Sequence, residues 1–124
     1  MTLSNKETAV SFLSLASSGK VREAYDKYVH ADFRHHNPYI KGDRETLLKG
    51  MEENARQFPQ KRFEAVRALE DGNLVAVHGK VQLSPAMPWI ALIHIFRFES
   101  GLIIEEWEAA QEVPKDSPNE YGMF

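Results

Sequence analysis

The hydrophobic pattern of the chain changes its period about half way along. In the first half, apolar residues recur every three or four positions, which is typical of amphipathic helices. The first helix is expected to begin at a capping box that starts at Ser4 and to stop at Gly19. A second helix is predicted after Gly19, with Val21, Ala24, Tyr25 and Tyr28 on one stripe. A third opens at Gly42-Asp43 and ends at Pro59.

The second half favours strands joined by short turns. Apolar residues there alternate with polar ones or form short runs, and the pairs Asp71-Gly72 and Ser100-Gly101 are typical of hairpin turns. The predicted strands are Phe63 to Leu69, Leu74 to Leu83, Trp89 to Phe98 and Leu102 to Gln111. Helices followed by an antiparallel meander predict a single α+β domain over residues 1–124.

The segment FRHHNP, at residues 33–38, falls between the second and third predicted helices. Asn37 before Pro38 predicts a turn, because the residue before proline is kept out of the helical conformation. Two imidazoles and a carboxamide in one short segment also suit the rim of a pocket. His35 alternates with His36 in an extended chain, so we expect His35 at the surface.

Composition excludes several classes of protein. With 43% hydrophobic and 27% charged residues, the chain resembles an ordinary globular domain. The net charge of −3, with both signs interspersed, predicts no basic surface for nucleic acid. The absence of cysteine excludes disulfides, thiolate metal sites and cysteine nucleophiles. Because no signal peptide or apolar run of membrane length is visible, we expect a cytoplasmic protein without membrane contact.

Hairpin register predicts two histidines side by side in the sheet. A two-residue turn at Ser100-Gly101 places His94 opposite Trp107, because paired residues in a hairpin sum to a constant. A loop centred on Ala86 places His78 opposite His94. The row across the four strands is then expected to be Ala65, His78, His94 and Trp107. Leu92, Phe96 and Glu105 are expected to be neighbours of this row on the same face of the sheet.

The other face of the predicted sheet is apolar as well. It is expected to carry Val75, Val77, Val81, Trp89, Ile93 and Ile95, together with Arg97, Glu106 and Glu108. Helices can cover only one face of the sheet, and so large an apolar face is rarely left in water. We therefore expect a homodimer through the sheet, with Glu106 and Glu108 at or near the dimer contact and outside any site.

Several segments of the chain resemble one known family. The segments HHNP, GNLVAVHGKV, HIFRFESGLIIEEWEAAQEVP and NEYGMF follow one another as in the SnoaL-like polyketide cyclase branch of the NTF2-like superfamily. The resemblance covers nearly the whole chain. It implies a cone-shaped α+β barrel, in which a curved antiparallel sheet wraps around a pocket and three N-terminal helices close the wide end. Many relatives are dimers through the sheet.

The resemblance also implies site residues. In cyclases of this family, an acid on the strand before IFRF acts as general acid and base in an intramolecular aldol closure, with a histidine on the neighbouring strand. His36, Asn37 and His78 match the pattern of the family, and position 94 carries His where Asp is common. The EHWD segment of the family is EEWE here, at residues 105–108.

The leading hypothesis is acid–base chemistry on a small carbonyl compound: enolisation, isomerisation or aldol-type cyclisation. His94 would take the proton next to the carbonyl, supported by His78, because an imidazole titrates near neutral pH. His36 and Asn37 would donate hydrogen bonds to the enolate oxygen. Glu105 would have a raised pKa unless it is ion-paired. The apolar wall of the pocket would be formed by Trp107, Phe96 and Leu92. A proton transfer of this kind needs no cofactor.

Two other classes of function stay open. A pocket lined by apolar side chains, with a few polar groups, would also hold a small hydrophobic ligand without any reaction. Alternatively, His36, His78 and His94 provide the three imidazoles found in some catalytic zinc sites. No local motif such as HExxH accompanies these histidines.

Overall fold

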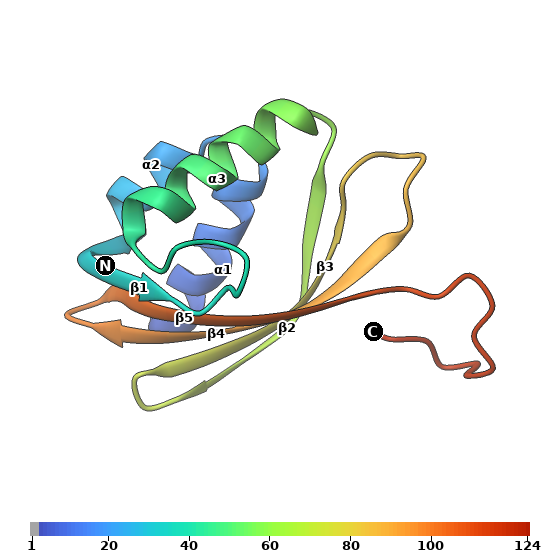
Figure 1. Ribbon diagram of the computed structural model, residues 1–124. Helices are drawn as coiled ribbons and strands as arrows, with labels where there is room; N and C mark the ends of the chain where they lie inside the picture. The colour runs from blue at the N-terminus through green and yellow to red at the C-terminus, as the bar shows by residue number, and fades with distance from the viewer. Residues whose placement is uncertain (1–2) are drawn as a thin grey trace.

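The computed structural model describes residues 3–124. Three helices pack on one face of a five-stranded sheet, whose β2 and β3 rise beside the end of α3 (Figure 1). The helices are α1 (Asn5–Ser17), α2 (Val21–Tyr28) and α3 (Arg44–Gln57). The strands are β1 (Val29–His35), β2 (Arg62–Asp71), β3 (Leu74–Gln82), β4 (Trp89–Glu99) and β5 (Leu102–Glu112). Among the described residues, no helix is long and apolar enough to cross a membrane.

The helix boundaries follow the capping signals of the sequence. Ser4 Oγ accepts a hydrogen bond from the Glu7 backbone N–H at 3.1 Å, and Glu7 Oε1 accepts one from the Ser4 N–H at 2.9 Å. Both halves of the capping box are therefore formed. Asp43 caps α3 by accepting a hydrogen bond from the Thr46 backbone N–H at 3.0 Å. All three predicted helices are confirmed.

The sheet has the strand order β1-β5-β4-β3-β2. The pairs β2–β3, β3–β4 and β4–β5 are antiparallel, as predicted, and β1 is parallel to β5 at one edge. The sheet is open and mixed, and the expected α+β cone fold is confirmed.

Strand β1 was not predicted, since the sequence indicated a turn or the rim of a pocket at residues 33–38 and no strand before it. Val29, Phe33 and His35 are buried, whereas the positions between them are half-buried or exposed. Since β1 is an edge strand with polar outward positions, it lacks the continuous apolar run that identifies β3 and β4. His35 is only 5% exposed, so the expectation that it lies at the surface is wrong. The turn begins after His35, where Asn37 Oδ1 accepts a hydrogen bond from the Tyr39 N–H at 3.0 Å.

The core lies between the helices and the inner face of the sheet. The ring centroid of Phe12, in α1, is 5.5 Å from that of Tyr25 in α2 and 6.0 Å from that of Phe96 in β4. Both pairs are edge-to-face, the geometry that aromatic quadrupoles favour. Burying each such side chain stabilises the fold by about 1.5–3 kcal/mol. This aromatic cluster fixes two helices against the centre of the sheet.

A β-bulge changes the register between β4 and β5. Phe98 pairs with Ile103, as the turn predicted, but Arg97 then pairs with Glu105. Ile104 is therefore an extra residue in β5, and every later side chain points to the opposite face from the one expected. His94 consequently lies opposite Glu108, and the prediction that it faces Trp107 is wrong.

The register between β3 and β4 also differs by one residue from the prediction. Val77 lies opposite His94, and His78 lies opposite Ile93. The physical reason is the connection over residues 83–88, which joins Gln82 to Trp89 as a pair rather than centring the loop on one residue. The predicted pairing of His78 with His94 is wrong, and the two imidazoles lie on opposite faces of the sheet.

The register of the β2–β3 hairpin also differs from the prediction. Its turn pairs Asp71 with Leu74, and a second bulge follows between Ala65 and Arg67. Ala65 therefore lies opposite Gly79 and not opposite His78. The predicted row of four residues across the sheet does not form.

Because of these register shifts, several side chains lie on the opposite face of the sheet from the one predicted. Val75 and Val77 are fully buried beneath the helices. On the outer face, Leu74 is 40% exposed, Ile93 is 42% exposed and Ile95 is 39% exposed. An apolar outer face is thus present, and it carries His78 and Glu105, not Glu106 and Glu108.

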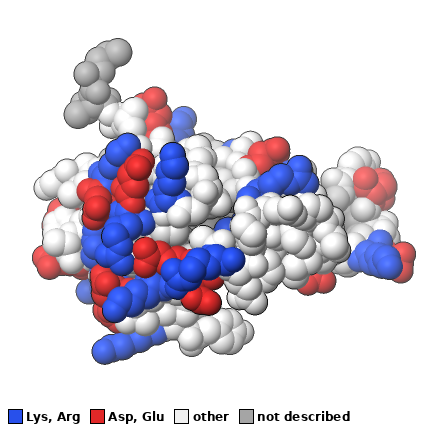
Figure 2. Space-filling view, turned by 90° about the horizontal axis from the view of Figure 1, so that it is seen from above, with Lys and Arg blue, Asp and Glu red and all other residues white. Residues whose placement is uncertain are grey.

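Charged side chains of both signs are interspersed on the face of the molecule seen from above (Figure 2). Between α2 and α3, Arg22 Nη2 lies 3.1 Å from Glu52 Oε1. Exposed ion pairs of this kind contribute little to stability.

We predict that Gly79→Ala destabilises the protein by about 1–3 kcal/mol, because overpacking forces the neighbours apart. A Cβ at Gly79 would meet Phe63 Cε1 at 2.9 Å and the Glu64 carbonyl oxygen at 3.0 Å. The matched control is Gly50→Ala in α3, where a Cβ meets only Ile40 Cδ1 at 3.6 Å. The control should stabilise by up to about 1 kcal/mol through helix propensity. Urea unfolding measures both variants, and equal stability of the two would contradict the prediction.

Candidate functional site

A cavity of about 350 Å³ lies between the helices and the inner face of the sheet. Most of its wall is apolar and includes Leu13, Leu47, Met51, Phe63, Val81 and Leu92. The polar side chains in its wall are Ser17, Asn37, Asn54, Lys61, His94, Glu106 and Glu108. A mostly apolar cavity with a few converging polar groups is the usual form of a small-molecule site.

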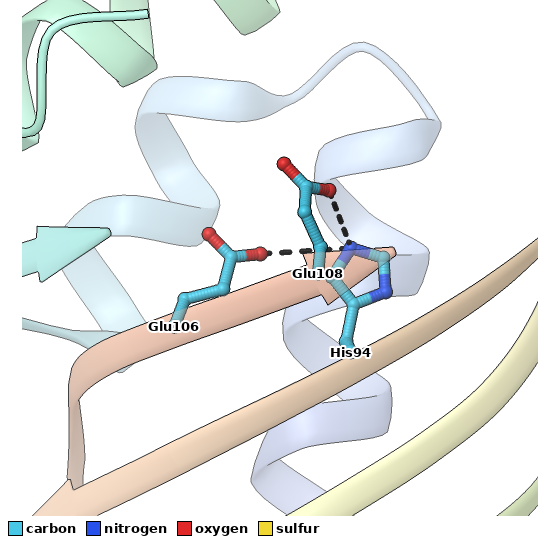
Figure 3. A group of neighbouring side chains, drawn as sticks. All are labelled: His94, Glu106 and Glu108. Carbon is cyan, nitrogen blue, oxygen red and sulfur yellow. Dashed lines mark ion pairs between the residues drawn. The ribbon is translucent and has the colours of Figure 1, made fainter. Parts of the chain in front are cut away.

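Three ionisable side chains meet in one wall of this cavity (Figure 3). His94 Nε2 lies 3.2 Å from Glu108 Oε2 and 3.5 Å from Glu106 Oε1. His94 and Glu106 are each 6% exposed, so water does little to screen their charges. The bulge at Ile104 is the cause of the grouping, because it turns both glutamates of β5 toward the face on which β4 presents His94.

The surroundings shift the pKa of each group in the cluster. Burial raises the pKa of Glu106 to about 7, with a further rise from the charge of Glu108 and a partial offset from His94. The hydrogen bond from His94 lowers the pKa of Glu108. Burial alone would lower the pKa of His94, but the hydrogen bond to Glu108 and the charges of both glutamates outweigh it, so this pKa is raised. Near neutral pH the cluster therefore holds a His94–Glu108 ion pair beside a carboxyl group that readily gains and loses a proton.

Asn37 holds the orientation of this cluster from the loop after β1. Its Nδ2 donates a hydrogen bond to Glu108 Oε1 at 2.7 Å. The ring of His35 anchors the loop at both nitrogens. Nδ1 accepts a hydrogen bond from the Asn37 backbone N–H at 3.1 Å, and Nε2 lies 2.7 Å from the Lys41 carbonyl oxygen, to which it donates. This pair of bonds fixes the tautomer of His35 and places the Asn37 amide in the cavity wall.

His36, Glu105 and Trp107 lie together on the outer face, and none of them lines the cavity. His36 Nε2 is 2.7 Å from Glu105 Oε2, and the His36 ring stacks on Trp107 at 5.0 Å between centroids. Arg34 and Arg97 each approach Glu105 to 2.9 Å. Chiefly through the hydrogen bond from Arg34, the pKa of Glu105 is lowered to about 2. Glu105 was expected to have a raised pKa unless it is ion-paired, and the structure shows the ion-paired case. The expected grouping of His36 and Trp107 with His94 is wrong.

His78 also lies on the outer face, so the prediction that it lies beside His94 is wrong. Its Nε2 lies 3.0 Å from the Met123 carbonyl oxygen, and its ring stacks on Phe124 at 5.9 Å between centroids. Its Nδ1 contacts Arg67. Besides Trp107, two further apolar residues were expected in the wall: Leu92 lines the cavity, whereas Phe96 is fully buried and stacks on the His94 ring at 5.6 Å between centroids.

Sequence reasoning missed Glu106 and Glu108 because it assumed a regular strand after the turn. Glu106 and Glu108 share a face of β5 in either register, and only the extra residue at Ile104, which no sequence signal marks, decides that this face is the inner one. Lys61 and Asn54 had no sequence signal either, since their approach to the cavity depends on the turn between α3 and β2.

The cluster also bears on metal binding. Oxygen and nitrogen atoms of His94, Glu106 and Glu108 lie within 4.8 Å of one another and can serve as cation ligands. Within the described part of the chain this is the sole group of three or more such residues close enough to share an ion, so the expected set of His36, His78 and His94 does not form. The ion pairs of the cluster account for its geometry without a metal.

We predict that Glu108→Gln lowers the pKa of His94 by about one unit or more, because it replaces the charged acceptor by a neutral one. A raised pKa means that protonation of His94 stabilises the folded state at low pH, and this stabilisation is lost as the pH rises through the folded pKa. The variant should therefore lose less stability than the wild type on going from acidic to alkaline pH. NMR titration of the His94 ring, with the exposed Glu64→Gln as control, measures the shift; an unchanged titration would contradict the assignment.

Comparisons with known proteins agree with the sequence resemblance. The chain matches the family model of the SnoaL-like domain over residues 10–106. Among solved structures it is similar to IdmH of Streptomyces antibioticus, a proposed polyketide cyclase, with a TM-score of 0.74 at 17% identity over 88% of this chain and 93% of that chain. It is also similar to a cystatin-fold protein of Novosphingobium aromaticivorans, with a TM-score of 0.73 at 20% identity over 86% of this chain and 98% of that chain. A search of curated proteins finds no significant match. The structural likeness supports the fold, and the family model spans most of the chain, which therefore belongs to the SnoaL-like domain family.

Proposed function

We propose that this protein is an enzyme that uses acid–base chemistry on a small carbonyl compound, by enolisation, isomerisation or aldol-type cyclisation. The observation that carries the proposal is the buried His94–Glu106–Glu108 cluster in the wall of an apolar cavity. Titratable groups with strongly shifted pKa values gather at functional sites more often than elsewhere. The family supports the proposal, since the similar IdmH is described as a proposed polyketide cyclase.

Glu106 is the general base in this proposal. A base works best when its pKa lies close to the working pH, and burial raises the pKa of Glu106 to about 7. The sequence suggested His94 for this role. Its raised pKa makes the imidazole hold its proton, however, and suits it to be a donor instead. Glu106 would remove the proton from the carbon next to the carbonyl.

His94 then supplies the positive charge that stabilises the enolate. Both nitrogens of an imidazolium are donors, and Nε2 faces the two glutamates (Figure 3). Nδ1 is buried and has no hydrogen-bond partner among residues 3–124. Because Nδ1 is closed off from the cavity, His94 would stabilise the enolate through its positive charge and not through a direct hydrogen bond from Nδ1. Glu108 and Asn37 act as positioning residues, because they hold the imidazolium and do not themselves need to touch the reacting atoms.

A binding protein without catalysis is the second candidate. It is favoured by the apolar cavity of about 350 Å³, a volume that suits a small hydrophobic molecule. The two candidates differ in one respect: a binding protein needs no group that titrates near neutral pH, whereas a proton-transfer enzyme depends on one.

We predict exchange of deuterium into the carbon next to the carbonyl when ketones and enones are incubated with the protein in heavy water. The rate should rise with pH as Glu106 deprotonates, through its pKa of about 7, and fall again as His94 loses its proton. Glu106→Gln should slow the exchange by about 100-fold or more. The exposed Glu64→Gln is the matched control. Binding of a ketone with no exchange above the uncatalysed rate would support the binding protein instead.

We also propose that the outer face of the sheet forms a homodimer. Leu74, Ile93 and Ile95 are each about two-fifths exposed on neighbouring strands, where no helix covers them. A symmetric dimer would bury this apolar row against the same row of a second copy.

We predict that Ile95→Glu, at the centre of the apolar row, produces a monomer. A charge directly opposite its symmetry mate is costly in an interface that excludes water. Light scattering after size-exclusion chromatography measures the mass, with Leu3→Glu as control, because Leu3 is half exposed beside α1 on the helical side. A wild-type monomer, or a dimer that survives Ile95→Glu, would contradict this interface.

A further inference from the structure

Lys61 is the only Lys or Arg among the described residues that line the cavity. It immediately precedes β2, and its Nζ donates a hydrogen bond to Asn54 Oδ1 at 2.5 Å. Lys61 forms no ion pair with any described carboxylate, in contrast to Lys27, Lys49 and Lys80. A half-buried ammonium whose partner is a neutral amide oxygen is unusual, because buried charges are normally paired.

The local structure fixes Lys61 in this position. The Phe58 N–H donates to the Asn54 carbonyl oxygen at 2.9 Å, and the Lys61 N–H donates to the Phe58 carbonyl oxygen at 3.1 Å. These two bonds close the turn between α3 and β2 and bring the Lys61 side chain back to Asn54 on the last turns of the helix. The ammonium is therefore held at the cavity before any ligand arrives.

The chemistry of the Lys61 ammonium indicates that it lacks an anionic hydrogen-bond acceptor. An ammonium has three N–H donors, and one of them is used by Asn54. Burial lowers the pKa of Lys61, which means that its surroundings disfavour the charge. An anionic group at this position would accept the remaining donors and restore the charge, through the hydrogen bonds that are strongest in proteins.

Lys61 and the acid–base cluster lie at different levels of the cavity. Arg62, the next residue, pairs with Gln82, which in turn pairs with Trp89, so Lys61 lies beside the 83–88 connection. Along β4, the backbone of Trp89 lies on the order of 15 Å from that of His94. The separation between the Lys61 ammonium and the His94 cluster is smaller than this, because both side chains are long and extend into the cavity. A molecule that reaches both sites needs a spacer of several bonds between its anionic group and its carbonyl group.

We infer that Lys61, positioned by Asn54, binds a carboxylate of the substrate, so that the substrate class is an elongated oxo acid whose carbonyl group reaches His94 and Glu106. This inference rests on the proposed function for the identity of the carbonyl group. The recognition of the carboxylate itself rests only on the cavity, the single cation in its wall and the amide that holds this cation.

The test compares two probes that differ in their charge. Hydrocinnamate and benzylacetone share a phenyl ring and a two-carbon spacer, and the carboxylate of the first is replaced by a methyl ketone in the second. NMR titration of the wild-type protein and of Lys61→Met gives the affinity for each probe. Lys61→Met should weaken hydrocinnamate binding by about tenfold or more, the usual loss for a hydrogen bond to a charged group, and leave benzylacetone binding unchanged. Lys61→Arg should keep most of the affinity for hydrocinnamate.

A matched control is Lys49→Met, an exposed lysine of α3 outside the cavity, which should change neither affinity. Wild-type protein that fails to bind hydrocinnamate, or a Lys61→Met variant that folds and binds it as well as the wild type, would overturn the inference. Because no turnover is measured, the outcome is separate from that of deuterium exchange. Selective loss of hydrocinnamate binding in a protein without exchange would support carboxylate recognition and refute only the enzyme.

Discussion

The extra residue in β5, Ile104, determines which carboxylates of this chain face the cavity and which face outward. Before it, Ile103 is buried under the helices. After it, Glu105 lies among two arginines and a histidine on the outer face, and Glu106 and Glu108 lie inside beside His94. A regular strand would have placed Glu105 in the apolar cavity and the other two outside. One inserted residue therefore produces two clusters of opposite character, a stable ion-paired one and one whose protons can move.

The inner cluster is costly to bury. Removing three ionisable groups from water costs several kcal/mol per charge, and ion pairing recovers this cost only in part. The protein lowers the cost with its own groups: His94 pairs with Glu108, Asn37 donates to Glu108, and the ring of His35 holds the Asn37 loop at both nitrogens. Apolar residues at these positions would give a more stable core. The retention of a titratable cluster at the cavity is therefore better explained by chemistry than by stability.

The sequence was sufficient for the parts of the fold that depend on local signals. Ser4 and Glu7 identify the first helix, Asp43 and Pro59 bound the third, and the glycine turns separate the hairpins. Resemblance to the family then supplied the arrangement of these elements. The site was less predictable, since a side chain changes face with each one-residue shift, and three such shifts occur, at Ile104, in the 83–88 connection and near Ala65. Leu92, Asn37 and His94 were placed at the cavity by sequence, whereas Glu106, Glu108 and Lys61 required the structure.

The parallel pairing of β1 with β5 sets a limit for anyone who wishes to redesign this cavity. Arg34 pairs with Glu105 and His35 with Glu106, so the two strands contribute consecutive residues to opposite sides of the sheet. Substitutions that keep the length of both strands alter one side at a time. A single insertion or deletion in either strand would instead exchange the contents of the two sides, moving an arginine or a carboxylate into the core.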